Sequence, residues 1–373
     1  MKTTRVKKTV LEPGKRSAQV LEFENELQHR VVGQEEAVSS LVNAYQSVIG
    51  GMTLKDRPIT NLLFLGPTGT GKTRAVEAAA EIPFGTAKAL IKIDCAEYQH
   101  GHEIAKLVGS PPGYIGHRET QAVLTQDSIN QFHTNELKMT FVLFDEIEKA
   151  SDDLWCLLLG ILDKATLTLG NNEKVDFSNT VIVLTSNLGA SEMSRLLSGN
   201  IGFTARPEAF GAEVEHKLSH VAIEAAKRWF SPEFMNRIDH TVVFRTLNEA
   251  ELAEILDLEL CAVQRRLMAA QPDRMFVIHC AKKARTFLVK EGTDPQYGAR
   301  PLKRAIDVHL VQPLTCLMST GQIAMGDVVN VQVGRGGGSL TFSKETAAPP
   351  CPVPELQPTA VCVYGAAEAH ASS

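Results

Sequence analysis

The sequence predicts an α/β fold with a parallel, doubly wound sheet, followed by a smaller and mainly helical domain. Up to residue 244, apolar runs typical of buried strands alternate with helical patterns, which favours parallel strands joined by helices. A glycine-rich stretch at residues 66–73 stands between an apolar run and an alanine-rich helical pattern. Past residue 245 the pattern changes to amphipathic helices and a short terminal β element.

Each expected element follows from the pattern of its residues. Continuous apolar runs, which suit central parallel strands, lie at residues 61–65, 89–94, 139–148, 180–187 and 241–244. Helical spacing covers residues 20–44 with a break at 31–34, and an apolar helix is expected at 154–162. In the smaller domain we expect helices at about 248–270 and 281–291, a third opening at 297–304, and strands at 327–333 and 339–342.

These patterns divide the chain into four segments. We expect a flexible N-terminal arm at residues 1–26, a large α/β domain at 27–244 and a small C-terminal lid domain at 245–343. Residues 344–373 are dominated by Ala, Pro and Ser, which predicts a disordered tail.

Composition argues against several classes of function. The 373 residues are 44% hydrophobic, enough for a sizeable core, and Lys plus Arg number 38 against 43 Asp plus Glu. That slightly acidic balance argues against nucleic acid as the main partner. The seven cysteines form no CxxC pair, and no apolar run is long enough to span a membrane. We therefore expect reduced thiols, a cytoplasmic location and no membrane partner.

The glycine-rich stretch GPTGTGKT predicts a P-loop. Strand, glycine loop, Lys-Thr and helix follow one another as phosphate binding requires, because glycines let backbone N–H groups turn toward phosphate oxygens. The helix N-terminus adds a partial positive charge. Lys72 can reach the outer phosphates of ATP, and the Thr73 hydroxyl can bind Mg²⁺. The residues expected around the nucleotide are Pro67, Thr68, Gly69, Thr70, Gly71, Lys72 and Thr73.

Polar side chains end two other expected strands. Asp145 and Glu146 end the run at residues 139–148, and Asn187 ends the run at 180–187. Open α/β sheets bind ligands at the carboxyl ends of their strands. Asp145 can hold Mg²⁺ there, and Glu146 can orient or deprotonate a water molecule. Asn187 can hydrogen-bond the γ-phosphate or its water, although an Asn before Leu-Gly also suits a simple turn.

Two further features leave alternatives open. Residues 109–116 hold two prolines and three glycines, so Tyr114 and Ile115 lie on an exposed loop, where they either contact a ligand or fold back onto their own domain. Val32 lies at the helix break and either packs on an adenine ring or belongs to the core.

Taken together, the motifs resemble the AAA+ module of Clp-family chaperones, most closely the second ATPase module of the ClpB and ClpC types. The similarity runs from about residue 27 to about residue 333. Seven blocks carry it in order: VVGQ at 31–34, GPTGTGKT at 66–73, GSPPGYIG at 109–116, FVLFDEIEKA at 141–150, VDFSNTVIVLTSNLG at 175–189, FSPEFMNRID at 230–239 and YGARPLKRAI at 297–306.

The resemblance implies roles that spacing alone does not give. Asn187 looks like sensor 1, and Arg300 like sensor 2, which reports the nucleotide state to the small domain. Arg237 is similar to the arginine finger that reaches the ATP of a neighbouring subunit, which implies a ring, typically a hexamer. Tyr114, with Ile115, matches the pore loop that grips unfolded polypeptide. Ile201, Gly202 and Phe203 resemble the loop that docks Clp ATPases on a Clp peptidase, although three residues also suit a local turn.

The sequence also departs from the family pattern. The family's N-terminal substrate-binding domain does not fit before residue 27, which suggests a single-ring, stripped-down relative. Residues 117–121 (HRETQ) replace the usual Glu-Glu-Gly-Gly after the pore loop.

The resemblance implies an ATP-dependent unfoldase or remodelling chaperone that threads polypeptide through a pore, with delivery to a Clp peptidase as a further expectation from residues 201–203. The alternative is a nucleotide-gated ring scaffold that binds a partner without threading. A DNA-remodelling role is disfavoured by the charge balance.

Overall fold

The computed structural model describes residues 12, 14–110, 122–199, 212–270, 275–293, 299–334 and 336–345. They form two compact units, each described separately below. The first contains the described residues of Met1–Leu65, Lys72–Leu188 and Ala222–Val243. The second contains those of Gly66–Gly71, Gly189–Val221 and Phe244–Ser373.

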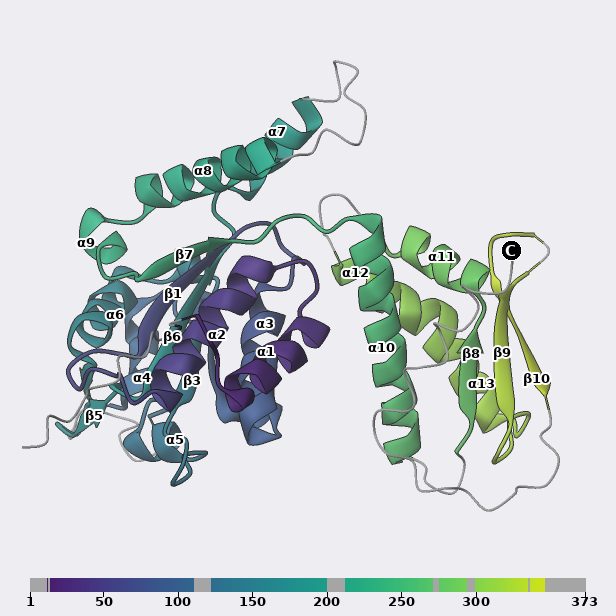
Figure 1. Cartoon of the computed structure of the whole chain (residues 1–373), viewed down its shortest axis with the longest axis horizontal. Coiled ribbons are helices and arrows are strands. Elements are labelled where there is room, and N and C mark those ends of the chain that lie inside the picture. The colour runs from purple at the N-terminus through teal and green to yellow at the C-terminus, as the bar shows by residue number, and fades with distance from the viewer. Residues whose placement is uncertain are drawn as a thin grey trace, which may run out of the picture. The chain divides into compact units, whose positions relative to one another are not determined.

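A five-stranded sheet forms the centre of the first unit (Figure 1). Its order is β2-β3-β6-β1-β7, and every neighbouring pair is parallel. The strands are β1 (Thr60–Leu65), β2 (Leu90–Asp94), β3 (Thr140–Asp145), β6 (Thr180–Ser186) and β7 (His240–Val243). All five were expected from the apolar runs, and the prediction of a parallel α/β sheet is confirmed.

The pairing brings the carboxyl ends of the central strands to one edge of the sheet. Leu65, the last residue of β1, is paired with Ser186, the last residue of β6. Phe144 of β3 is paired with Leu184 of β6. The residues that follow these three strands therefore lie close together, as ligand binding by parallel sheets requires.

Helices cover the sheet of the first unit. The main ones are α1 (Ala18–Arg30), α2 (Glu35–Ile49), α3 (Lys72–Phe84) and α6 (Asp152–Lys164), with the short α4 (Ala105–Val108), α5 (Gln126–Asn130) and α9 (Pro232–Met235). Helix α3 lies against β2, β3 and β6, and α2 lies against β7, while α1 packs on α2 and α3 (Figure 1). Among the described residues, no helix is long and apolar enough to cross a membrane.

The N-terminal helix begins inside the range expected for a flexible arm. Helix α1 begins at Ala18, and its N-cap Ser17 accepts a hydrogen bond from the backbone N–H of Val20 at 3.3 Å. Phe23 stacks on Tyr45 of α2 with ring centroids 4.3 Å apart, and Leu27 is fully buried. These contacts hold residues 18–26 in a packed helix, where the sequence predicted a flexible arm.

A small hairpin was not expected from the sequence. It consists of β4 (Thr166–Thr168) and β5 (Lys174–Asp176), in which only Leu167 and Val175 face inward. Strands of three residues are too short for alternation to predict them.

The second unit holds a three-stranded sheet of order β10-β9-β8. Strands β8 (Val277–Cys280) and β9 (Val328–Val333) are parallel, and β10 (Leu340–Glu345) is antiparallel to β9. The helices are α7 (Ala190–Gly199), α10 (Glu249–Ala270), α11 (Lys282–Glu291), α12 (Arg300–Ile306) and α13 (Gln312–Ser319), and α8 (Ala212–Trp229) spans the division between the units. Strands β9 and β10 and helices α10, α11 and α12 were expected, whereas β8 was not.

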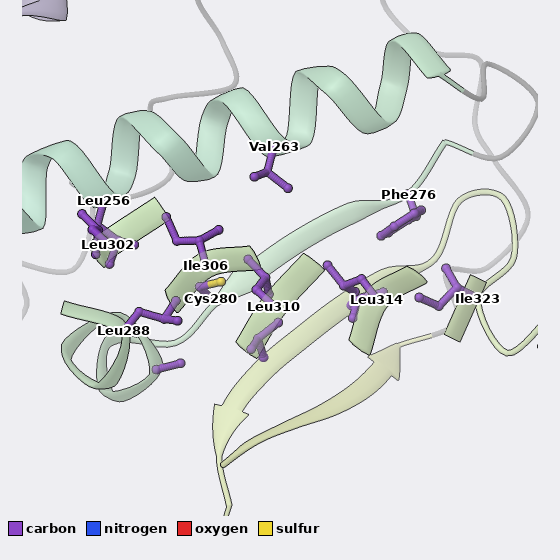
Figure 2. Packing of buried hydrophobic residues seen from close by; sticks show 13 residues of the cluster. Leu256, Val263, Phe276, Cys280, Leu288, Leu302, Ile306, Leu310, Leu314 and Ile323 are labelled. Carbon is purple, nitrogen blue, oxygen red and sulfur yellow. The ribbon is translucent and has the colours of Figure 1, made fainter. Parts of the chain in front are cut away.

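Helices and sheet of the second unit enclose an apolar core (Figure 2). Leu256 and Val263 of α10 face Leu302, Leu310 and the strands across it. Buried Gln264 ties α10 to β8, because its side chain donates to the carbonyl of Phe276 at 2.7 Å and accepts from the N–H of Ile278 at 2.9 Å.

A π-helical turn, η8 (Asp307–Val311), joins α12 to α13. Pro313 follows it in the first turn of α13. Proline has no N–H to donate, and its ring clashes with the carbonyl four residues earlier, so the wider turn relieves that clash.

Candidate active site

The loop at residues 66–71 connects β1 to α3 and has the backbone of a P-loop. Gly66 has φ +134°, and a Cβ there would lie 2.4 Å from the carbonyl oxygen of Phe244, so only glycine fits. Gly69 and Gly71 also have positive φ. Within the loop, the Thr70 hydroxyl donates to the carbonyl of Pro67 at 2.9 Å.

The two residues after the loop meet the tips of β3 and β6. Lys72 is buried at the start of α3, and its Nζ donates to Oδ1 of Asn187 at 3.0 Å. The Thr73 hydroxyl lies 3.2 Å from both carboxylate oxygens of Asp145. The structure thus brings together four residues that the sequence singled out from three separate motifs.

Thr185 of β6 joins the acid pair and was not singled out from the sequence. Its hydroxyl donates to Oδ1 of Asp145 at 2.5 Å and accepts the backbone N–H of Glu146 at 3.1 Å. The available signal was a polar residue near the carboxyl end of an apolar run, because such a residue is buried only with hydrogen-bond partners.

Glu146 has a left-handed backbone, with φ 57° and ψ 49°. Residues other than glycine rarely adopt this conformation, and it concentrates at functional sites. The Glu146 carboxylate pairs with Lys149 in the 3₁₀ turn η4 (Ile147–Lys149). This hydrogen bond is the main cause that raises the pKa of Lys149. Because the lysine is exposed, the pair contributes little to stability.

Lys92 is a second lysine near the acids. Its Nζ lies 3.7 Å from Oδ2 of Asp145 and 3.3 Å from Oε1 of Glu77 on α3. Both tip acids, Asp145 and Glu146, therefore have a lysine close by in this arrangement.

Buried Cys95 lies among the acids at this edge. Burial raises the pKa of its thiol, and the carboxylates of Asp94, Asp145, Glu148 and Glu146 raise it further. The thiol therefore stays protonated and unreactive at neutral pH. The same carboxylates create a negative field that suits a cation.

Thr73 and Asp145 fit Mg²⁺. A hydroxyl and a carboxylate are the hard oxygen ligands that Mg²⁺ prefers, and Mg²⁺ usually keeps water and phosphate oxygens at its other positions. Among the described residues there is no cluster of three or more His, Cys, Asp or Glu that could enclose a metal alone. The arrangement suits a metal that arrives with a nucleotide.

Arg237 lies at the opposite edge of the sheet. Its carbonyl oxygen accepts a hydrogen bond from Nδ2 of Asn61 at 2.9 Å. Asn61 lies near the start of β1, four residues before Leu65, and four residues of extended strand span about 13 Å. Its guanidinium donates to the Glu233 carbonyl at 2.9 Å and lies 3.1 Å from the Glu233 carboxylate and 3.7 Å from that of Asp163. The structure does not bring Arg237 to Lys72 of its own chain.

The remaining predicted residues are placed only in part. Val32 is half-buried in the bend after α1, whereas its neighbour Val31 is buried. Arg300 is exposed at the start of α12, and the residue before it, Ala299, donates its backbone N–H to the carbonyl of Gly69 at 3.1 Å within the second unit. Tyr114, Ile115, Ile201, Gly202 and Phe203 lie outside the described residues.

A P-loop, a strand-end acid pair and a polar strand tip at one edge of a parallel sheet define the P-loop ATPases. Comparison with known families refines this class. Residues 57–241 match the model of the AAA domain (Cdc48 subfamily). Residues 247–331 match the model of the C-terminal, D2-small domain, of ClpB protein. The chain therefore belongs to the AAA+ ATPases of the Clp chaperone family, and the resemblance and the prediction of an ATPase are confirmed.

Individual relatives agree with this family. The chain is 39% identical over 334 residues to the chaperone protein ClpB of Meiothermus ruber, covering 88% of this chain and 36% of the relative. It is 39% identical over 321 residues to ClpB of Aquifex aeolicus, covering 85% and 30%. The chain thus spans about a third of the length of these curated relatives.

A solved structure shares the fold. A closed-state electron cryomicroscopy reconstruction of Hsp104 with ATPγS and FITC casein matches with a TM-score of 0.71 and 28% identity, covering 87% of this chain and 52% of that one. The predicted domain bounds and the roles of individual site residues stay predictions.

Proposed function

We propose that this chain is the ATP-driven motor of a ring-forming protein chaperone that pulls on unfolded polypeptide. The convergence of Lys72, Thr73, Asp145 and Asn187 at one edge of the sheet carries the proposal. The ClpB relatives and the Hsp104 reconstruction with casein support the chaperone part.

In the proposed reaction, the loop at residues 66–71 and Lys72 bind the phosphates of ATP. Glu146 accepts a proton from water while the water oxygen attacks the γ-phosphorus, and the bond to the β–γ bridging oxygen breaks to leave ADP. Thr73 and Asp145 would hold Mg²⁺, which when bound offsets phosphate charge. Asn187 orients the γ-phosphate or the attacking water, and Arg300 reports the nucleotide state to the small domain.

The position of Arg237 supports an action on the neighbouring subunit. It lies at the sheet edge opposite Lys72, away from the phosphate-binding residues of its own chain, and in the proposed ring it would act on the site of an adjacent copy instead. A guanidinium placed against the γ-phosphate stabilises the charge that develops there. We therefore propose a homo-oligomeric ring, typically a hexamer, with sites shared between subunits.

Threading through a pore is the finer part of the proposal and relies on Tyr114 and Ile115. Docking on a Clp peptidase through residues 201–203 stays a prediction with no support from the ClpB relatives. The rival function is a nucleotide-gated scaffold that binds its partner without pulling.

A Glu146→Gln variant tests the proposed chaperone function. It keeps the shape of the side chain but cannot take a proton, so we expect it to bind ATP, to turn over at least about 100-fold more slowly and to retain FITC-labelled casein while ATP is present. Fluorescence anisotropy of the labelled casein measures retention, and phosphate release measures turnover. Glu97→Gln, at an exposed position near the same sheet edge, is the matched control and should behave as the wild type.

Each outcome separates the hypotheses. Casein that stimulates wild-type turnover and stays bound to Glu146→Gln supports the chaperone. If casein does not stimulate ATP turnover by the wild type and does not stay bound to Glu146→Gln, the results contradict the chaperone function and favour the scaffold. Normal turnover in Glu146→Gln contradicts the role of Glu146.

A further inference from the structure

Glu148 connects the tips of β3 and β6, although the proposed reaction gives it no role. It lies in the turn η4, two residues after Glu146, and its Oε1 accepts the backbone N–H of Asn187 at 3.1 Å. The two residues are far apart in the sequence and come from different strand ends. The bond therefore fixes one tip of the site relative to the other.

The other end of Asn187 is fixed by Lys72. Lysine Nζ carries only donors, so the Asn187 atom that faces it at 3.0 Å is the oxygen Oδ1. The amide nitrogen Nδ2, with its two hydrogens, is then the part of the side chain that remains for a phosphate oxygen or a water. Glu148 holds the backbone from which this donor projects.

A carboxylate is a costly choice for this position. Among the described residues, the second oxygen of Glu148, Oε2, is buried and has no hydrogen-bond partner. Together with Asp94, Asp145 and Glu146 it also adds to the raised pKa of nearby Cys95, which is caused mainly by burial of the thiol. A charged acceptor makes a shorter and stronger bond to an N–H than a neutral one, but an uncharged oxygen at the same place can still accept it. Such an unsatisfied group in a site is a reason to look for function.

We propose that Glu148 is a positioning residue for ATP hydrolysis: it holds the backbone of Asn187 so that the amide nitrogen points at the γ-phosphate or the attacking water. Glu148 does not touch the reacting atoms. The proposal rests on hydrolysis at this site, but it does not depend on chaperone activity, on threading or on a ring of a particular size.

Two substitutions at Glu148 distinguish the loss of its negative charge from the loss of its hydrogen-bond acceptor. Glu148→Gln keeps an oxygen at Oε1, and we expect it to stay within about 3-fold of the wild-type kcat because a neutral acceptor still holds Asn187. Glu148→Ala removes the acceptor, and we expect kcat to fall on the order of 10- to 100-fold through misplacement of Asn187. The KM for ATP and the affinity for fluorescent ADP should change little in both, because the P-loop contacts remain.

A double-mutant cycle with Asn187→Ala tests whether Glu148 affects kcat through Asn187. If Glu148 acts through Asn187, Glu148→Ala adds little to the loss of kcat already caused by Asn187→Ala. A general structural defect would add its full effect. The matched control is Glu103→Ala, which removes a carboxylate that accepts the backbone N–H of His100 at 3.1 Å outside the site, and it should leave kcat unchanged.

Three results would overturn the proposal: additive losses in the cycle, a loss in Glu148→Gln as large as in Glu148→Ala, or wild-type kcat in Glu148→Ala. Absence of hydrolysis in the wild-type chain would instead contradict the proposed function, so the two failures are distinguishable.

Discussion

The hydroxyl of Thr185 forms hydrogen bonds with both Asp145 and Glu146 at the end of β3. It donates to the carboxylate of Asp145 and accepts the N–H of Glu146. Glu146 has a left-handed backbone, which surrounding contacts must hold in place. Thr185 therefore fixes the direction in which the proposed base leaves the strand.

Thr185→Val tests this role with an isosteric change. We expect kcat for ATP to fall about 10-fold or more, because the Glu146 N–H loses its acceptor and the base is free to move. Stability should fall by about 1–3 kcal/mol, the cost of an unpaired buried polar group. Phosphate release and denaturant unfolding measure the two effects.

Thr180→Val is the matched control on the same strand. Thr180 is also fully buried, and its hydroxyl donates to the Phe177 carbonyl at 2.7 Å at the far end of β6. It should lose similar stability but keep its ATPase activity. Equal kcat in the two variants would refute a special role for Thr185.

The sequence predicted the motif residues better than the residues that hold them. Lys72, Thr73 and Asp145 could be predicted because their types, spacing and place after apolar runs follow from phosphate and metal chemistry. Thr185 and Glu148 could not, because their roles depend on which strand tips become neighbours. That information appears only when β3 pairs with β6.

At the scale of elements, long periodic segments were predictable and short or irregular ones were not. The five parallel strands, α10 and α11 carry strong apolar patterns. Strand β8 has no continuous apolar run, because His279 interrupts it, and it is recognised only by its parallel pairing with β9. The π-helical turn η8 results from Pro313 in the first turn of α13. Pro313 widens the preceding turn only where the chain is helical on both sides, and a local pattern does not show this.

Leu310 in η8 tests whether the second unit depends on its own core. It is fully buried in the cluster of Figure 2, so Leu310→Ala should cost about 2–5 kcal/mol in transfer and cavity energy. Val308→Ala, in the same turn but 43% exposed, should change stability by no more than about 0.5 kcal/mol.

Two spectroscopic signals separate the units. Both tryptophans, Trp155 and Trp229, belong to the first unit. Leu310→Ala should therefore shift the loss of helical circular dichroism to lower denaturant concentration. The unfolding transition followed by tryptophan fluorescence should keep a midpoint close to that of the wild type. A parallel shift of both signals would show that the second unit has no independent core.

At the scale of the whole molecule, the proposed ATP site requires more than one copy of the chain. Lys72 and the acids lie at one edge of the sheet, while Arg237 lies at the other with Glu233 and Asp163 beside its guanidinium. In the proposed ring of identical subunits, a head-to-tail interface would place the two edges against each other. Each ATP site would then be completed by the next subunit.

Mixing two inactive variants tests this central claim most directly. Lys72→Ala loses phosphate binding, and Arg237→Ala should lose on the order of 10³-fold in kcat. In an equimolar mixture with random assembly, about a quarter of the interfaces pair an intact Lys72 with an intact Arg237, so the mixture should regain about that share of wild-type phosphate release. A mixture no more active than its components, or an Arg237→Ala variant with the wild-type rate, would contradict a site shared between subunits.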